Sequence, residues 1–100
     1  MQKKYQVKTT PTAEDDILSI FKYIAKDKPS AALKWVDEVE NQINSLEKYP
    51  KRCPVIPEAS ELGVDYRHII YGNYRTIFRI SQNKVIILRV INASQLLMLI

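Results

Sequence analysis

The chain has 100 residues, of which 46% are hydrophobic and 26% charged, so we expect residues 1–100 to form a single globular domain with no room for a second. One cysteine, Cys53, and one histidine, His68, exclude an internal disulfide and a cysteine-histidine zinc site, and we expect a reducing, intracellular setting and no cofactor. The net charge of +4 arises wholly in residues 51–100, because residues 1–50 hold eight lysines against eight acidic residues.

A strand and a helix are the first elements expected along the chain. Residues 5–9 alternate between apolar and polar and are rich in β-forming types, which predicts a half-buried strand. Thr10 and Pro11 then give a helix start, and acidic residues follow in the first turn, where the helix dipole favours them. Apolar positions at helical spacing come next, at Ala13, Ile17, Ile20, Phe21 and Ile24. We expect this helix to end near residues 26–28, because Pro29 prevents its continuation.

A second helix is expected to begin at Ser30, which would cap it. Its apolar stripe is formed by Ala32, Val36, Val39, Ile43 and Leu46. Two helices joined by a few residues pack antiparallel, so we expect an amphipathic hairpin. Tyr49 and Pro50 close the second helix, and residues 51–65, which contain two prolines and a glycine, are interpreted as an irregular connection.

Three runs of β-branched and aromatic residues follow, at residues 66–71, 74–80 and 85–91, which predicts a meander of antiparallel strands. The order strand, helix, helix and three strands predicts an α+β fold, with the antiparallel helical hairpin packed on one face of a small, mostly antiparallel sheet. The first strand most simply joins this sheet parallel to a later strand. Lys84 and Arg89 interrupt the last apolar region, so we expect no membrane span.

Positive charge gathers in the predicted sheet, since the chain has five basic residues and no acidic one from Tyr66 onward. Such a field favours an acidic partner, either nucleic acid or an acidic protein segment. The alternative is that the arginines are solvated or stacked on aromatic rings and serve the fold alone. All the arginines of the chain lie in its second half, at Arg52, Arg67, Arg75, Arg79 and Arg89.

Taken in order, these features resemble the RelE/ParE toxins of bacterial toxin-antitoxin modules. The resemblance is carried by the order of elements, the second helix stopped at Tyr49-Pro50, the pairs Tyr66-Arg67 and Tyr74-Arg75 that flank Gly72, and the closing strand at residues 85–91. It covers nearly the whole chain. It implies a small cytoplasmic toxin of a type II, plasmid-stabilising module, held inactive in a hetero-oligomer with an antitoxin encoded beside it.

The resemblance implies one of two targets. RelE-like toxins cut mRNA in the ribosomal A site, whereas ParE-like toxins inhibit DNA gyrase without being nucleases. Arg75 matches the strand arginine of the nucleases, and Arg67 falls where they carry a basic residue on the preceding strand. Asn92 and Gln95 stand where many members have histidine and arginine, and neither side chain carries a positive charge or transfers a proton near neutral pH. This departure favours a ParE-like inhibitor that binds gyrase and is not an enzyme.

Two alternatives stay open beside this leading hypothesis. One is a metal-independent, ribosome-dependent endoribonuclease that uses Arg67 and Arg75. The other is a protein of the toxin fold that has lost toxicity and survives as a binding module for its antitoxin. We expect the antitoxin to cover the apolar tail at residues 96–100. The candidate target- or antitoxin-binding residues are Arg67, Arg75, Arg79, Arg89, Leu96 and Leu97.

The faces on which these arginines lie depend on strand register. A two-residue turn at Gly72-Asn73 places Arg67 and Arg75 on opposite faces of the sheet, whereas a bulge or a longer loop would bring them together. His68 is either a general acid or base beside Arg67 or a strand residue that covers part of the sheet. The second interpretation is favoured, because no titratable partner is visible nearby in the sequence.

Overall fold

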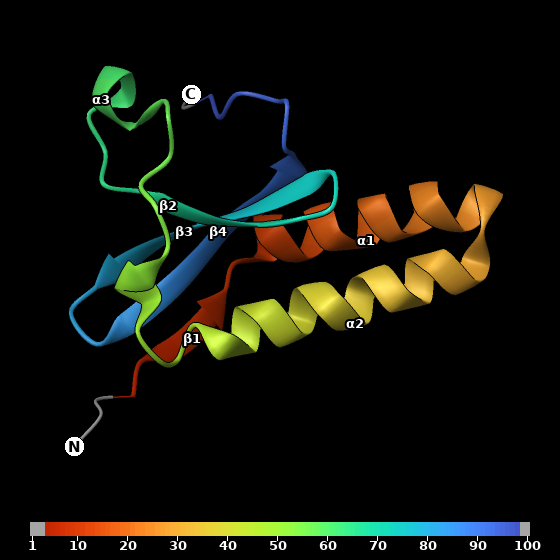
Figure 1. Cartoon of the computed structure of the whole chain (residues 1–100), viewed down its shortest axis with the longest axis horizontal. Coiled ribbons are helices and arrows are strands. Elements are labelled where there is room, and N and C mark those ends of the chain that lie inside the picture. The colour runs from red at the N-terminus through yellow and green to blue at the C-terminus, as the bar shows by residue number, and fades with distance from the viewer. Residues whose placement is uncertain (1–3, 99–100) are drawn as a thin grey trace.

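Two long helices form an antiparallel hairpin beside a four-stranded sheet in the computed structural model, which describes residues 4–98 (Figure 1). Helix α1 spans Pro11–Asp27 and α2 spans Pro29–Ser45. Thr10 caps α1 as predicted, since its hydroxyl oxygen accepts a hydrogen bond from the backbone N–H of Ala13 at 3.2 Å. No helix within residues 4–98 is long and apolar enough to cross a membrane.

The start of α2 differs from the sequence prediction, which placed the cap at Ser30. Lys28 is the N-cap, with φ −147° and ψ 94°, and Pro29 is the first helical residue. Pro29 is the cause, because a proline drives the preceding residue into an extended conformation and its own fixed φ suits the first helical turn. Lys28 therefore ends α1 and begins α2, and the N-terminus of α2 has no side-chain cap.

The strands are β1 (Gln6–Thr9), β2 (Arg67–Tyr71), β3 (Tyr74–Ser81) and β4 (Lys84–Asn92), in the spatial order β1-β4-β3-β2. β1 is parallel to β4 and the other pairs are antiparallel, which confirms the predicted α+β fold. The β2–β3 hairpin has the register of a two-residue turn, so Arg67 and Arg75 point to opposite faces. A bulge does occur, but between β3 and β4.

The connection between α2 and β2 is more ordered than the sequence indicated. It contains a short 3-10 helix, η1 (Pro50–Arg52), and the one-turn helix α3 (Ala59–Leu62). Gly63 ends α3 with φ 68°, a left-handed conformation that glycine adopts without strain. Val55 forms an antiparallel bridge with Arg67, and the N–H of Ile56 donates to the carbonyl of Tyr66 at 2.9 Å. The connection therefore runs along the outer edge of β2.

The two faces of the sheet are covered by different parts of the chain. One face packs against the helical hairpin in the main core, where Phe78 and Ile87 meet Ala13, Val39 and Leu46. Ile77 precedes Phe78 on β3 and so points to the other face. There it joins a smaller apolar cluster with Ile56, Ala59, Ile91 and Leu97. The sequence did not predict this second cluster, which packs the connection and the C-terminal residues against the sheet.

Replacing Thr10 by alanine should lower the free energy of unfolding by about 1–2 kcal/mol, since Thr10 both caps α1 and donates from its hydroxyl to the carbonyl of Ile87 at 2.8 Å. Thr12→Ala is the matched control, because Thr12 lies exposed in the first turn of the same helix. Urea denaturation followed by circular dichroism measures both. Equal losses for the two variants would show that the cap does not join the helix to β4.

Candidate functional site

Arg75 of β3 is the centre of a buried polar cluster on the sheet face opposite the hairpin. Its side chain is only 3% exposed. Its two terminal nitrogens donate to the two carboxylate oxygens of Glu58, at 3.1 and 2.5 Å. A guanidinium paired in this two-on-two manner has good hydrogen-bond geometry. The positive charge of Arg75 is therefore compensated from within the chain.

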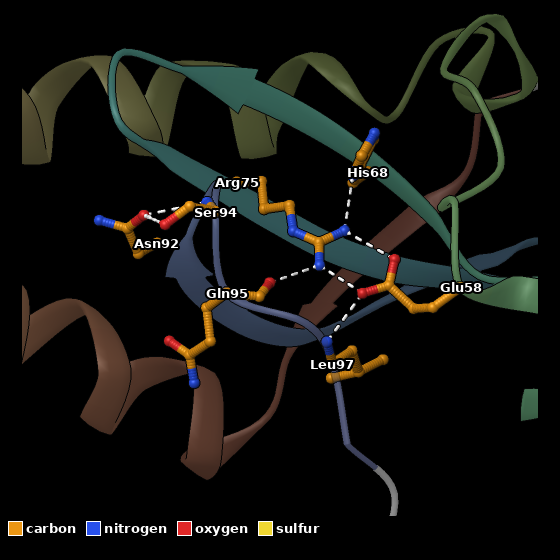
Figure 2. Close-up of polar contacts among 7 residues, drawn as sticks. All are labelled: Glu58, His68, Arg75, Asn92, Ser94, Gln95 and Leu97. Carbon is orange, nitrogen blue, oxygen red and sulfur yellow. Dashed lines mark hydrogen bonds and ion pairs between the residues drawn. The ribbon is translucent and has the colours of Figure 1, made fainter.

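The ion pair also holds the C-terminal segment, which we define as residues 93–98. Nη2 of Arg75 donates to the main-chain carbonyl of Gln95 at 2.7 Å, and the N–H of Leu97 donates to Glu58 Oε2 at 2.7 Å (Figure 2). The side chain of Leu97 is buried in the second apolar cluster. One carboxylate and one guanidinium thus fasten the connection and the C-terminal segment to β3.

Asn92 forms the turn that directs the C-terminal segment back over the sheet. Its Oδ1 accepts hydrogen bonds from the N–H and the hydroxyl of Ser94, at 2.9 and 2.7 Å, and its carbonyl accepts from the N–H of Gln95 at 2.9 Å. Asparagine favours such turns because its side chain mimics a backbone acceptor. Asn92 therefore has a structural role through its side chain, whereas Gln95 is held by its main-chain N–H and carbonyl and its side chain is exposed.

His68 lies against this cluster, with Nδ1 3.1 Å from Nη1 of Arg75. A guanidinium only donates, so Nδ1 accepts and carries no proton. Burial lowers the pKa of His68, and the charge of Arg75 lowers it further, while Glu58 opposes the shift. His68 is therefore a neutral ligand of Arg75 near pH 7. The charged neighbours of His68, which the sequence did not reveal, are Arg75 of β3 and Glu58 of the connection.

The pKa of Glu58 falls to about 2 from an ordinary 4.5, mainly because Arg75 donates hydrogen bonds to it; burial opposes this shift and the N–H of Leu97 adds to it. The pair is thus charged at every pH near neutrality. Nε of Arg75 is buried and has no hydrogen-bond partner among residues 4–98. While Glu58 is in place, the terminal nitrogens of Arg75 are occupied and cannot clamp a phosphate.

The other predicted arginines are not brought to this cluster. Nη1 of Arg67, on the opposite face, donates to the carbonyls of Cys53 and Lys51, at 2.5 and 3.3 Å. Arg89 pairs with Asp16 of α1 through contacts of 2.7 and 3.2 Å. Arg67 therefore holds the connection to β2, and Arg89 joins β4 to α1. Arg79 is exposed and makes neither a hydrogen bond nor an ion pair with any other residue in the range 4–98.

Arg79 belongs to a group of exposed cations on the sheet. Lys8 of β1 and Arg79 of β3 both pair with Ile86 of β4, so the three side chains form one row across the sheet. Lys84 lies two residues before Ile86 and shares its face. Lys8, Arg79 and Lys84 are all exposed, and we call them the basic surface. It lies at the end of the sheet near the β3–β4 turn.

The remaining candidates lie in the C-terminal segment and the connection. Leu96 is 68% exposed beside the buried Leu97, while residues 99–100 of the predicted apolar tail lie outside the described residues. Cys53 is buried, which raises its pKa and makes its thiol a poor nucleophile. Within the described part of the chain, no group of three histidine, cysteine or acidic residues could hold a metal ion.

Glu58 is the central residue that sequence reasoning missed. It is one of three acidic residues in residues 51–100, a half of the chain that has seven basic ones. A buried arginine needs a counter-charge, so this scarcity was the one available signal. This scarcity does not show which of the three acidic residues pairs with Arg75. Glu58 lies 17 positions from Arg75, in a connection whose sequence has no periodic pattern.

The chain is similar to known proteins in both sequence and fold. The family model of the ParE toxin of the type II toxin-antitoxin system, parDE, matches residues 7–97. A solved structure of the chromosomal ParDE system from P. aeruginosa shares the fold, with a TM-score of 0.70 and 20% identity over 89% of this chain and 96% of that one. The toxin-antitoxin complex RelBE2 from Mycobacterium tuberculosis gives a TM-score of 0.57 and 26% identity, over 92% and 94%. No curated protein sequence matches the chain.

Glu58→Gln should lower the free energy of unfolding by about 3–5 kcal/mol, because it leaves the buried charge of Arg75 uncompensated. Adding Arg75→Met should recover most of this loss, since no unpaired charge then remains. Glu61→Gln, on the exposed side of α3, is the control and should change stability little. A double variant as unstable as Glu58→Gln alone would contradict a role for charge compensation.

Acid should remove the contribution of Glu58 in a defined window. Its pKa is lower in the folded chain, about 2, than its ordinary value of 4.5, so its stabilisation is complete above pH 4.5 and is lost as the pH falls toward 2. The stability difference between the natural chain and Glu58→Gln should therefore shrink over this range. Urea denaturation at pH 6, 4 and 3 measures it, and a constant difference would count against the ion pair.

Proposed function

Since the chain belongs to the ParE toxin family of type II toxin-antitoxin systems, we propose that it arrests growth by binding and inhibiting DNA gyrase, as the toxin of a plasmid-stabilising module. The toxin acts in the cytoplasm and forms a hetero-oligomer with its antitoxin. It works as a binding protein and catalyses no reaction.

The state of Arg75 is the observation that carries this proposal. Cleavage of RNA without a metal ion needs a cation that contacts the phosphate in the transition state, and the family resemblance assigns that role to Arg75 and Arg67. Arg75 is buried and ion-paired with Glu58, and Arg67 points to the other face of the sheet. Gyrase inhibition requires only a complementary surface, so it is compatible with this closed arrangement.

The basic surface supplies the exposed charge for such binding. Of the candidate arginines, Arg79 alone is exposed and unpaired among residues 4–98, and Lys8 and Lys84 extend its positive field. Leu96 adds an exposed apolar side chain from the C-terminal segment. The other candidate residues do not contact the target in this proposal. They hold the surrounding segments in place through contacts within the chain: Arg67, Arg75, Arg89 and Leu97. The antitoxin binds the basic surface through acidic residues of its own and so competes there with the target.

A RelE-like endoribonuclease is the second candidate, and the 26% identity to the RelBE2 complex favours keeping it. It requires the connection to move so that Glu58 releases Arg75. The third candidate, an antitoxin-binding protein without toxicity, predicts no growth arrest when the chain is expressed alone. Growth arrest on induction therefore separates the third candidate from the other two.

Purified toxin should inhibit DNA supercoiling by gyrase and leave ribosome-bound mRNA intact. Reversing two charges in Arg79→Glu with Lys84→Glu should raise the toxin concentration for half inhibition by about tenfold or more, because attraction to an acidic target becomes repulsion. Lys22→Glu with Lys48→Glu, which also reverses two exposed charges but leaves the basic surface intact, is the matched control. Cleavage of mRNA at ribosomal A sites with no effect on gyrase would reverse the order of the candidates.

A further inference from the structure

A cleft of about 740 Å³ lies where the end of the helical hairpin faces the β2–β3 turn. Its walls come from the last turn of α1, the first turns of α2 and residues 71–74. None of these residues belongs to the basic surface or to the Arg75 cluster. The cleft is therefore a separate feature of the molecule.

Aromatic rings form the apolar lining of the cleft. Trp35 and Tyr74 pack edge to face, with ring centroids 5.3 Å apart and planes at 67°. Tyr71 and Tyr23 extend the lining, and Tyr23 is 70% exposed. Nε1 of Trp35 is buried, and no residue in the described part of the chain is its hydrogen-bond partner. An apolar side chain that enters the cleft would gain contact with several rings.

The rim of the cleft is positively charged. Lys26, Lys28 and Lys34 line it, and Asp27 is the one acidic residue among its lining residues. The N-terminus of α2 also lies here, with no acidic residue in its first turn and no side-chain cap. The positive end of this helix dipole therefore adds to the field of the lysines. Together with the aromatic lining, this charge fits a carboxylate carried next to an apolar side chain.

The cleft and the basic surface are too far apart to be one contact. Tyr74 in the cleft and Arg79 in the basic surface lie five positions apart on β3, about 16 Å along the strand, and they point to opposite faces. A partner that occupies both must wrap around the edge of the sheet. A second attachment of this kind raises overall affinity, because binding at one point raises the effective concentration at the other.

We propose that the cleft binds an acidic, apolar segment of the antitoxin. A carboxylate of that segment lies against Lys34 and the N-terminus of α2, and an adjacent apolar side chain covers Trp35 and Tyr74. We assign the cleft to the antitoxin because toxins of this family belong to toxin-antitoxin systems. The target competes with the antitoxin at the basic surface, so a second contact in the cleft would keep the antitoxin bound. The inference rests on the antitoxin as partner and does not require gyrase as the target.

The test is a titration of the full-length toxin with the antitoxin encoded beside it, purified alone. With ¹⁵N in the toxin only, the single tryptophan gives one indole N–H resonance, which should shift when the complex forms. Lys34→Glu should raise the Kd by about tenfold, and Tyr23→Ser by about threefold or more. Lys22→Glu makes the same charge change on α1 outside the cleft and should leave the Kd within about twofold.

An unchanged indole resonance, or equal Kd values for Lys34→Glu and Lys22→Glu, would overturn the proposal. A Lys34→Glu variant that keeps its antitoxin affinity but loses gyrase inhibition would assign the cleft to the target instead. A resonance that shifts with toxin concentration alone would assign it to a second copy of the chain. The titration contains no gyrase, so its failure leaves gyrase inhibition untouched, and a toxin without effect on gyrase leaves the titration valid.

Discussion

The ion pair between Glu58 and Arg75 determines the structure of the sheet face that the helices leave uncovered. Each charge alone would be costly in that interior, and the two-on-two contact compensates both. The connection supplies the carboxylate, β3 supplies the guanidinium, and the C-terminal segment adds a main-chain donor and a main-chain acceptor. The small apolar cluster around Ile77 and Leu97 forms on this frame. Without the pair, the segments that cover this face would have only modest apolar contact to hold them.

The same pair limits what the positive charge of the chain can do. Basic residues dominate the second half of the sequence, yet most of the arginines there are engaged by carbonyls or carboxylates of the chain itself. The field that reaches solvent on the sheet comes from Lys8, Arg79 and Lys84. A count of charges along the sequence therefore overstates the exposed basic area, because burial and pairing decide which charges a partner meets.

Local patterns predicted most of the architecture, and long-range contacts were the part they could not predict. The cap at Thr10, the two helices and the strands follow from residue spacing and turn chemistry, which act over a few positions. The β2–β3 register stayed open between a two-residue turn and a bulge or longer loop, and the structure has the two-residue turn. The cap of α2 lies at Lys28 and not at Ser30, because Pro29 holds Lys28 in an extended conformation. The partner of Arg75, the order within residues 51–65 and the role of Asn92 depend on segments far apart in sequence, where periodicity carries no information.

The charges of residues 1–50 sum to zero, but they are unevenly distributed over the surface. Asp16 in the N-terminal half of α1 contacts β4, and Lys26 in the last turn of α1 lines the aromatic cleft. Asp16 is compensated there by Arg89, whereas Lys34 faces the cleft with no acidic residue in the first turn of α2. Charges of opposite sign at the two ends of a helix do not cancel for a partner that touches one end, since water and salt screen the other. The hairpin holds four lysines against seven acidic residues, yet the end that faces the cleft is positively charged.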